Sequence, residues 1–155
     1  MIEMKQILMP TDFSPFAAHA LKYAASFAQE YGAKLHILHV IEDLAHVSYF
    51  EVFQVPMPAT FMQDVEAKAK AEMDKLMADP MLEGIEKESI IRRGVPFVEI
   101  LTAAGELKVD LITIATHGRT GLQQVLFGST AEKVVRKAPC PVLSIRHPEH
   151  DFVMP

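Results

Sequence analysis

Cysteine is almost absent from this chain of 155 residues, since Cys140 is the only one. A single cysteine excludes an intrachain disulfide, so nothing indicates an oxidising compartment and we expect a cytoplasmic protein. Long apolar runs are also missing. No stretch approaches the roughly 18 apolar residues of a membrane span, so we expect no membrane insertion. The N-terminus, MIEMKQILMPTDF, lacks the apolar core of a signal peptide and predicts a first strand.

A surplus of basic residues is missing as well. The formal net charge is -5, and phosphate backbones are held by surplus lysine and arginine, so we expect no nucleic-acid partner. Half of the residues, 50%, are apolar and 23% are charged, which is typical of one globular domain.

Three nucleotide and hydrolase motifs do not occur. The chain has no G-x-x-x-x-G-K-[ST] loop, no G-x-G-x-x-G after its first strand, and no G-x-S-x-G nucleophile elbow. Standard kinase, GTPase, dehydrogenase and α/β-hydrolase functions are therefore excluded. Ser14 and Ser129 are better explained as helix caps than as nucleophiles.

Strand-like and helix-like segments alternate along the chain. Apolar runs predict strands at residues 7–9, 35–40, 89–91, 109–115 and 142–145. Helical spacing and caps predict helices from Ser14–Pro15 to Gly32, over 60–78, over 96–107, and after Ser129, which forms a capping box with Glu132. The second helix has a predicted buried stripe of Met62, Val65, Ala69, Met73, Leu76 and Met77. Residues 42–59 show no clean period and predict a long connection with possible helical turns.

This alternation predicts a single doubly wound α/β domain over residues 1–147, followed by a C-terminal tail, 148–155. We expect a Rossmann-like, five-stranded parallel sheet in the order 3-2-1-4-5 with helices on both faces. Such sheets bind ligands beyond the carboxyl ends of the strands, where the strand order reverses. The segments that leave the two strands at this point are PTDFS and ATHGRTG.

The second of these segments has the composition of an anion site. Gly118 and Gly121 would let backbone N–H groups approach an anion, and Gly128, Ser129 and Thr130 precede a helix whose N-terminus is positive. We therefore favour a phosphorylated ligand. The alternative is that the glycines only form turns and that Ser129 only caps the helix.

Three stretches together resemble the universal stress protein family. They are ILMPTDFS near the start, THGRTGL-x5-GS in the glycine-rich loop, and AEKVVRKAPCPVLSIR after it, and the resemblance extends over nearly the whole chain. Members of the nucleotide-binding branch carry the pattern G-x2-G-x9-G-[ST]. Gly118 and Gly128-Ser129 match its later part, whereas Ala115 stands in place of its first glycine.

The resemblance implies ATP as the ligand, with Mg²⁺ as its expected cation. By this resemblance, Pro10, Thr11, Asp12 and Val40 border the adenine and ribose, and Ile114 and Ala115 continue that wall. The residues implied around the phosphates are His117, Gly118, Arg119, Gly128, Ser129 and Thr130. Taken alone, Asp12 could equally be a turn or helix cap. If Ala115 needs a positive φ, its methyl group adds strain.

The expected function is an ATP-binding sensor or regulator of stress or energy state that does not turn ATP over rapidly. One alternative is an interaction dimer without nucleotide, and another is a slow ATPase that uses Asp12 or His117. The family also implies a homodimer through the fifth strand, formed by Val142, Leu143, Ser144 and Ile145. We assign no metal site to protein side chains, since His36 and His39 fall on opposite faces of a strand.

Overall fold

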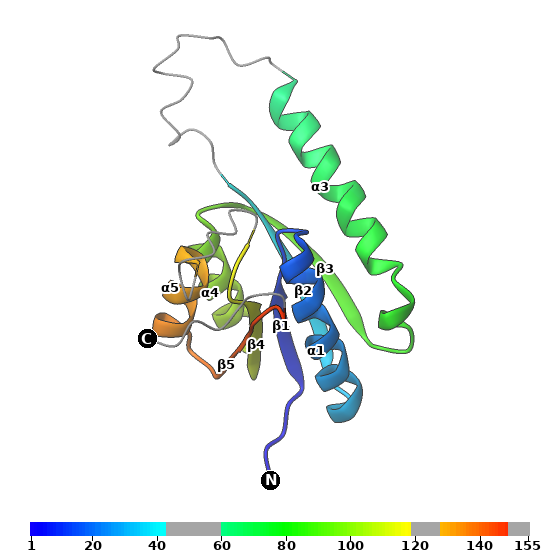
Figure 1. Ribbon diagram of the computed structural model, residues 1–155, viewed down its shortest axis with the longest axis vertical. Coiled ribbons are helices and arrows are strands. Elements are labelled where there is room, and N and C mark those ends of the chain that lie inside the picture. Colours follow the sequence, from blue (N-terminus) through cyan, green and yellow to red (C-terminus); the bar gives the residue numbers. More distant parts are fainter. Residues whose placement is uncertain (43–59, 119–127, 149–155) are drawn as a thin grey trace.

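The sheet of this protein is wholly parallel. The computed structural model describes residues 1–42, 60–118 and 128–148. Within them, five strands pair in the order β3-β2-β1-β4-β5, so the predicted fold and strand order are confirmed (Figure 1). The strands are β1 (Gln6–Pro10), β2 (Lys34–Glu42), β3 (Lys87–Gly94), β4 (Leu111–Ala115) and β5 (Val142–Ile145). The helices are α1 (Pro15–Tyr31), α3 (Phe61–Met77), α4 (Pro96–Glu106) and α5 (Ser129–Lys137), with a short 3-10 turn, η2 (Pro80–Leu82).

Helices cover both faces of the sheet. Alternate residues of a strand point to opposite faces, so Ile7 and Met9 of β1 pack with α1, whereas Leu8 packs in the core under α4 and α5. α1 and α3 lie on one side and α4 and α5 on the other (Figure 1). In the described ranges, none of the helices combines the length and the apolar character needed to cross a membrane.

The predicted ends of α1 are confirmed in detail. The side chain of Ser14 accepts a hydrogen bond from the N–H of Ala17 at 3.2 Å, and Pro15 occupies the first helical position. Gly32 ends the helix with a φ of 62°, the left-handed conformation that glycine adopts without a steric cost. The Ser14 cap thus fixes the start of α1 five residues after the end of β1 at Pro10.

The predicted capping box of α5 is wrong. Gly128 is the N-cap, Ser129 is the first helical residue, and among the described residues no side chain caps the helix. The reason is the N–H of Gly128, which donates to the carbonyl of Thr116 at 2.7 Å and keeps residue 128 extended. Glu132 instead lies 3.4 Å from Arg136, one turn further along the helix.

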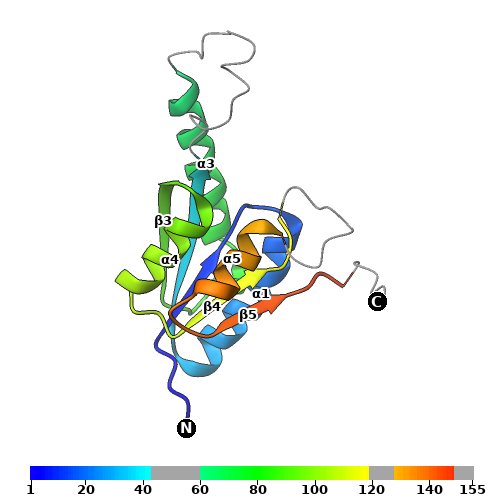
Figure 2. The same cartoon turned by 90° about the vertical axis from the view of Figure 1, so that its left-hand side faces the viewer.

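The predicted buried stripe of α3 is correct only in its centre. Ala69 and Met73 are buried, whereas Met62, Val65, Leu76 and Met77 are half-buried. The first turns of α3 extend beyond the carboxyl edge of the sheet, where few described neighbours can cover them (Figures 1 and 2).

Several strand boundaries also differ from the prediction. β3 is longer than expected, β4 begins at Leu111 instead of Val109, and Glu42 ends β2 instead of opening a connection. The rest of the predicted connection, 43–59, and the end of the tail, 149–155, lie outside the described residues.

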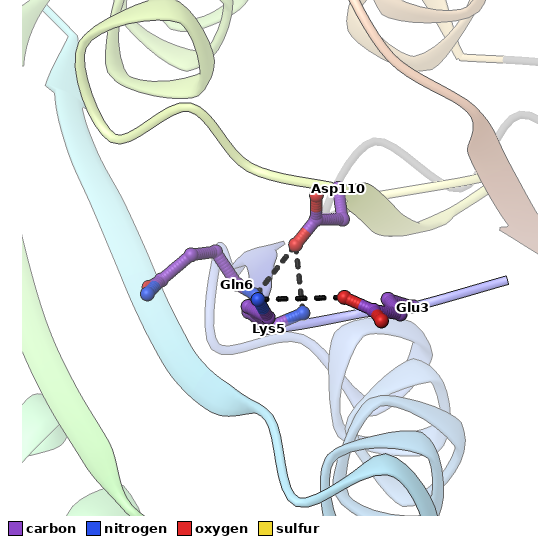
Figure 3. Close-up of polar contacts among 4 residues, drawn as sticks. All are labelled: Glu3, Lys5, Gln6 and Asp110. Carbon is purple, nitrogen blue, oxygen red and sulfur yellow. Dashed lines mark hydrogen bonds and ion pairs between the residues drawn. The ribbon is translucent and has the colours of Figure 1, made fainter.

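Asp110 ties the start of β4 to the start of β1. Its carboxylate accepts hydrogen bonds from the backbone N–H groups of Lys5 at 2.7 Å and Gln6 at 2.9 Å (Figure 3). Its own N–H donates to the carbonyl of Gln6 at 2.8 Å. Figure 3 also shows the ion pair of Lys5 with Glu3, at 3.4 Å, which is solvent-exposed and adds little. Asp110 therefore sets where the two central strands begin to pair.

Replacing this carboxylate should weaken the fold. We expect Asp110→Ala to lower the free energy of unfolding by about 1–2 kcal/mol, because two backbone donors lose a charged acceptor. Urea unfolding followed by circular dichroism measures this difference. Asp74→Ala, which removes only the exposed ion pair with Lys70, is the control and should change stability by less than about 0.5 kcal/mol. Equal effects of the two substitutions would contradict the role given to Asp110.

Candidate functional site

A cavity of about 630 Å³ opens at the carboxyl edge of the sheet, where β1 and β4 lie side by side. After β1 the chain turns toward one face of the sheet, and after β4 it turns toward the other face. The space between the ends of β1 and β4 therefore remains uncovered. Every described residue that we predicted for the site lines this cavity: Pro10, Thr11, Asp12, Val40, Ile114, Ala115, His117, Gly118, Gly128, Ser129 and Thr130. Arg119, the remaining predicted residue, and Gly121 lie outside the described residues.

The turn after β1 is held by its own side chains. The N–H of Phe13 donates to Thr11 Oγ1, and the N–H of Ser14 donates to Asp12 Oδ1, both at 3.0 Å. The backbone N–H of Thr11 donates to the carbonyl of Leu38 at 2.8 Å, which fixes the turn against β2. The Asp12 carboxylate therefore has one oxygen engaged in the turn and the other directed toward the glycine-rich loop.

Gly118 lies directly against Asp12. A Cβ atom at position 118 would come within 2.6 Å of Asp12 Oδ2, which is closer than two unbonded atoms can approach. A Cβ at Gly128 would meet the carbonyl oxygen of Thr116 at 3.4 Å and the Cα of His117 at 3.9 Å, which are ordinary contacts. Of these two glycines, only Gly118 leaves no room for a Cβ atom unless the Asp12 carboxylate moves.

Ala115 is not strained. It is the last residue of β4, and its φ is not among the positive values found at non-glycine residues of the described chain. The methyl group thus sits on an ordinary strand backbone at the wall of the cavity. The strain that a positive φ would have caused at this position does not arise.

Phe13 and His39 were missed as site residues by the sequence analysis, which considered His39 only as a metal ligand. Phe13 has a φ of 61°, a conformation that bulky residues seldom adopt. Its ring lies against that of His39, with the centroids 4.4 Å apart, and His39 Nδ1 lies 2.8 Å from the carbonyl oxygen of Thr11. Both residues line the cavity. No local sequence pattern indicates this geometry, because it depends on contacts between β2 and the turn after β1.

The two histidines of β2 have separate surroundings, as their predicted positions on opposite faces imply. His36 is buried, with Nε2 2.6 Å from Gln6 Oε1 and Nδ1 3.3 Å from Glu88. Burial lowers the pKa of His36, and this effect outweighs the opposite influence of the Glu88 carboxylate. His117, in contrast, lies at the cavity, and its Nδ1 is 3.0 Å from Thr116 Oγ1.

The difference between the two glycines gives a direct test. We expect Gly118→Ala to displace the Asp12 carboxylate and to lower the free energy of unfolding by about 1–2 kcal/mol. Gly128→Ala should cost less than half as much, since its Cβ has room. Thermal unfolding of the two variants compares them. A Gly118→Ala variant as stable as the unchanged protein would contradict the close approach.

The profile of the universal stress protein family matches residues 3–146 of this chain. Universal stress protein MJ0531 of Methanocaldococcus jannaschii is 31% identical over 147 residues, which cover 95% of this chain and 85% of that protein. The solved structure of MJ0577, a universal stress protein of the same organism, is 31% identical, covers 96% of this chain and 99% of that one, and has a TM-score of 0.81.

Two further solved structures show the fold with a ligand. A universal stress protein in complex with cAMP and one from Archaeoglobus fulgidus in complex with dAMP are 20% and 22% identical to this chain, with TM-scores of 0.70 and 0.60. Each match covers 93% of this chain and 98% of the other. Because the family profile spans nearly all of the chain and relatives of 30% identity or more cover it almost from end to end, this protein belongs to the universal stress protein family.

Proposed function

We propose that this protein binds ATP in the cavity at the carboxyl edge of its sheet and acts in the cytoplasm as a regulator of stress or energy state. The observation that supports this most directly is the arrangement of Gly118, Asp12 and the start of α5 around one cavity. A glycine backbone, a carboxylate and a helix N-terminus are groups that suit phosphates and ribose hydroxyls.

The phosphate groups would lie between the glycine-rich loop and α5. The first backbone N–H groups of a helix have no partner within it, and the helix dipole makes this end positive. In α5 these groups follow Gly128, and no side chain of the described residues caps them. Ser129 and Thr130 also line the cavity. The failure of the predicted capping box thus leaves the N–H groups of α5 available for an anion.

Asp12 would bind the ribose hydroxyls or a water molecule of a bound cation. Mg²⁺ is commonly held by one or two carboxylates together with phosphate oxygens and water, so a site with Asp12 as its carboxylate fits such an ion when it arrives with ATP. The cation would neutralise phosphate charge. In the residues that the structure describes, no cluster of three or more histidine, cysteine, aspartate or glutamate side chains could hold a metal without the nucleotide.

An adenine nucleotide is the ligand class that we favour. The two related structures with a nucleotide hold cAMP and dAMP, both of which carry adenine. The unstrained backbone of Ala115 supports binding in this chain despite the alanine in place of a glycine. At the cavity wall, the only addition is one methyl group.

Binding without rapid turnover fits the surroundings of His117. This ring is buried, its Nδ1 engages Thr116, and the Phe16 ring centroid lies 6.2 Å from its own. We propose that the ring supports the loop and does not transfer protons. Regulation would follow from a population shift, in which ATP stabilises one arrangement of the loop that a partner recognises.

We also propose a homodimer through β5. β3 and β5 are the two edges of the sheet. β3 carries charged residues that discourage pairing, among them Arg92 and Arg93, whereas Val142, Leu143, Ser144 and Ile145 of β5 include no charge. Pro141 and Ile145 direct their carbonyl groups toward β4. By the alternation of a parallel ladder, Val142 and Ser144 direct their backbone groups outward, where a second copy can pair.

A proline on this edge should prevent pairing. We expect Ser144→Pro to yield a monomer in sedimentation velocity where the unchanged protein is a dimer, because proline has no N–H to donate. Ile91→Lys, on the opposite edge, is the control and should leave the dimer intact. A Ser144→Pro protein that folds and remains dimeric would place the interface elsewhere.

The nucleotide itself can be identified directly. We expect protein that is purified gently and then denatured to release intact ATP, which chromatography identifies. Gly118→Val should release less than about a tenth as much, because its side chain would occupy the position of the Asp12 carboxylate. Release of AMP or a cyclic nucleotide would change the assigned ligand.

Two further measurements sharpen this experiment. Ala115→Gly restores the family glycine and should retain as much ATP as the unchanged protein, since Ala115 has an ordinary backbone. An unchanged protein that is empty on purification and gives no heat on titration with ATP would exclude the proposed function and would favour an interaction dimer without nucleotide.

A further inference from the structure

A group of aromatic rings connects α1 with the segment that follows β5. Phe16, His19 and Tyr23 belong to α1, and His147 is the second residue after the end of β5 at Ile145. The ring centroid of His147 lies 5.1 Å from that of His19 and 5.4 Å from that of Phe16. In both contacts the edge of one ring meets the face of the other. His147 therefore attaches the chain after β5 to α1.

The two histidines lie at the margin of the core, not within it. Below α1, Leu143 and Ile145 of β5 pack in the apolar core. His19 and His147 are both half-buried, so part of each ring is in contact with water. Protons can therefore reach the two imidazoles without disrupting the packing below them.

The charged groups near this pair are positive. Lys22 lies three residues after His19 on α1, and Arg146 precedes His147 in the chain. The ring of Tyr23, with its centroid 5.5 Å from that of His19, adds a hydroxyl group that is uncharged near neutral pH. A positive charge on either imidazole is therefore added to a positive surrounding.

His19 is held in its neutral form by this surrounding. Partial burial, the His147 ring and the Lys22 ammonium group each lower the pKa of His19, and no carboxylate of the described residues raises it. The pKa is thus lower in the folded protein than in an unfolded chain, for which the usual value is about 6.5. The stability that this contact contributes is present above that pH and is lost as the pH falls toward the lowered pKa of His19.

Protonation reverses the interaction between the two rings. Neutral aromatic rings in edge-to-face contact attract each other. A first proton leaves one of the two imidazoles neutral, whereas a second proton makes both positive with their centroids 5.1 Å apart. Like charges at this separation repel, and Lys22 and Arg146 add to the repulsion.

We propose that His19 and His147 form an acid-sensitive attachment, which holds the segment after β5 against α1 near neutral pH and releases it when both rings are protonated. Histidine is the side chain whose ordinary charge change falls between pH 5 and 8, so a fall in the pH of the surroundings operates the attachment. This inference goes beyond the proposed function and does not depend on a bound nucleotide.

Phe16 extends the effect of this attachment to the cavity. Its ring contacts His147 on one side, and on the other its centroid lies 6.2 Å from that of His117, which lines the cavity. Release of His147 removes one of the groups that hold Phe16 in place. Acid therefore changes the packing beside the cavity as well as the attachment itself.

Nuclear magnetic resonance of the full chain follows both the charge and the contact. At about pH 7.5, nuclear Overhauser effects should connect the His147 ring with the rings of His19 and Phe16, and these effects should be lost at about pH 5.5. The midpoint of the His19 titration should lie below the ordinary value. It should move back toward that value in His147→Gln, because an uncharged amide then replaces the second imidazole.

Two substitutions at position 19 separate charge from shape. His19→Gln does not titrate, so the contact of Phe16 with His147 should persist at about pH 5.5. His19→Lys places a permanent positive charge beside His147, so this contact should be lost already at about pH 7.5. Tyr23→Phe keeps the ring and removes only the hydroxyl group. It is the matched control and should keep the pH dependence of the unchanged protein.

Each outcome decides for or against the attachment. Loss of the contact in acid in the unchanged protein, but not in His19→Gln, supports the proposal. Contacts that persist in acid in the unchanged protein overturn it, as does an equal loss in His19→Gln or a His19→Lys protein that keeps the contact near neutral pH. Circular dichroism at each pH reports the whole fold. Global unfolding of the unchanged protein at about pH 5.5 also overturns the proposal, since the release would then not be local.

Discussion

A parallel sheet must be covered on both faces, because its strands are joined by crossovers that leave neither face to solvent. In this protein, the need to cover both faces also determines where the cavity lies. β1 passes to α1 on one face, and β4 passes to α5 on the other. The two strands are neighbours, so their connections diverge and the carboxyl edge between them stays open. The cavity is a consequence of how the core is buried.

The rigidity of the turn after β1 depends on the same geometry. Thr11 and Asp12 hold the backbone of the residues that follow them, and Ser14 caps α1. These bonds maintain the positive φ of Phe13, whose ring is held against His39. A strained residue between two well-bonded neighbours is typical of functional sites. The turn is thereby fixed before any ligand arrives, which reduces the entropy lost on binding.

Charge is distributed unevenly around this scaffold. The edge strand β3 carries charged residues, which oppose pairing with another strand, whereas β5 carries none. α3 shows a similar contrast on a smaller scale: on its exposed side Lys70 pairs with Asp74, whereas on its cavity side Lys68 and Glu72 have no ion pair with the described residues. Each contrast identifies a surface that is still able to bind another molecule after the core has formed.

The sequence by itself determined the alternation of strands and helices, the ends of α1 and the strand order, and its resemblance to the family supplied a part of the residues that line the cavity. These features follow from local signals: apolar runs, the Ser14–Pro15 cap, Gly32, and motifs that stay close together in the chain. The rule for strand crossovers then leaves few ways to arrange them.

Only the tertiary structure decided the rest, because it depends on contacts between segments that are far apart in the sequence. Gly128 displaced Ser129 as the cap of α5 since its N–H reaches Thr116. Gly118 is required because of Asp12, more than a hundred residues earlier in the chain. It could not be predicted either that residues of α3 line the cavity. Helical spacing shows which residues share a face of a helix but not whether that face meets a core or a cavity.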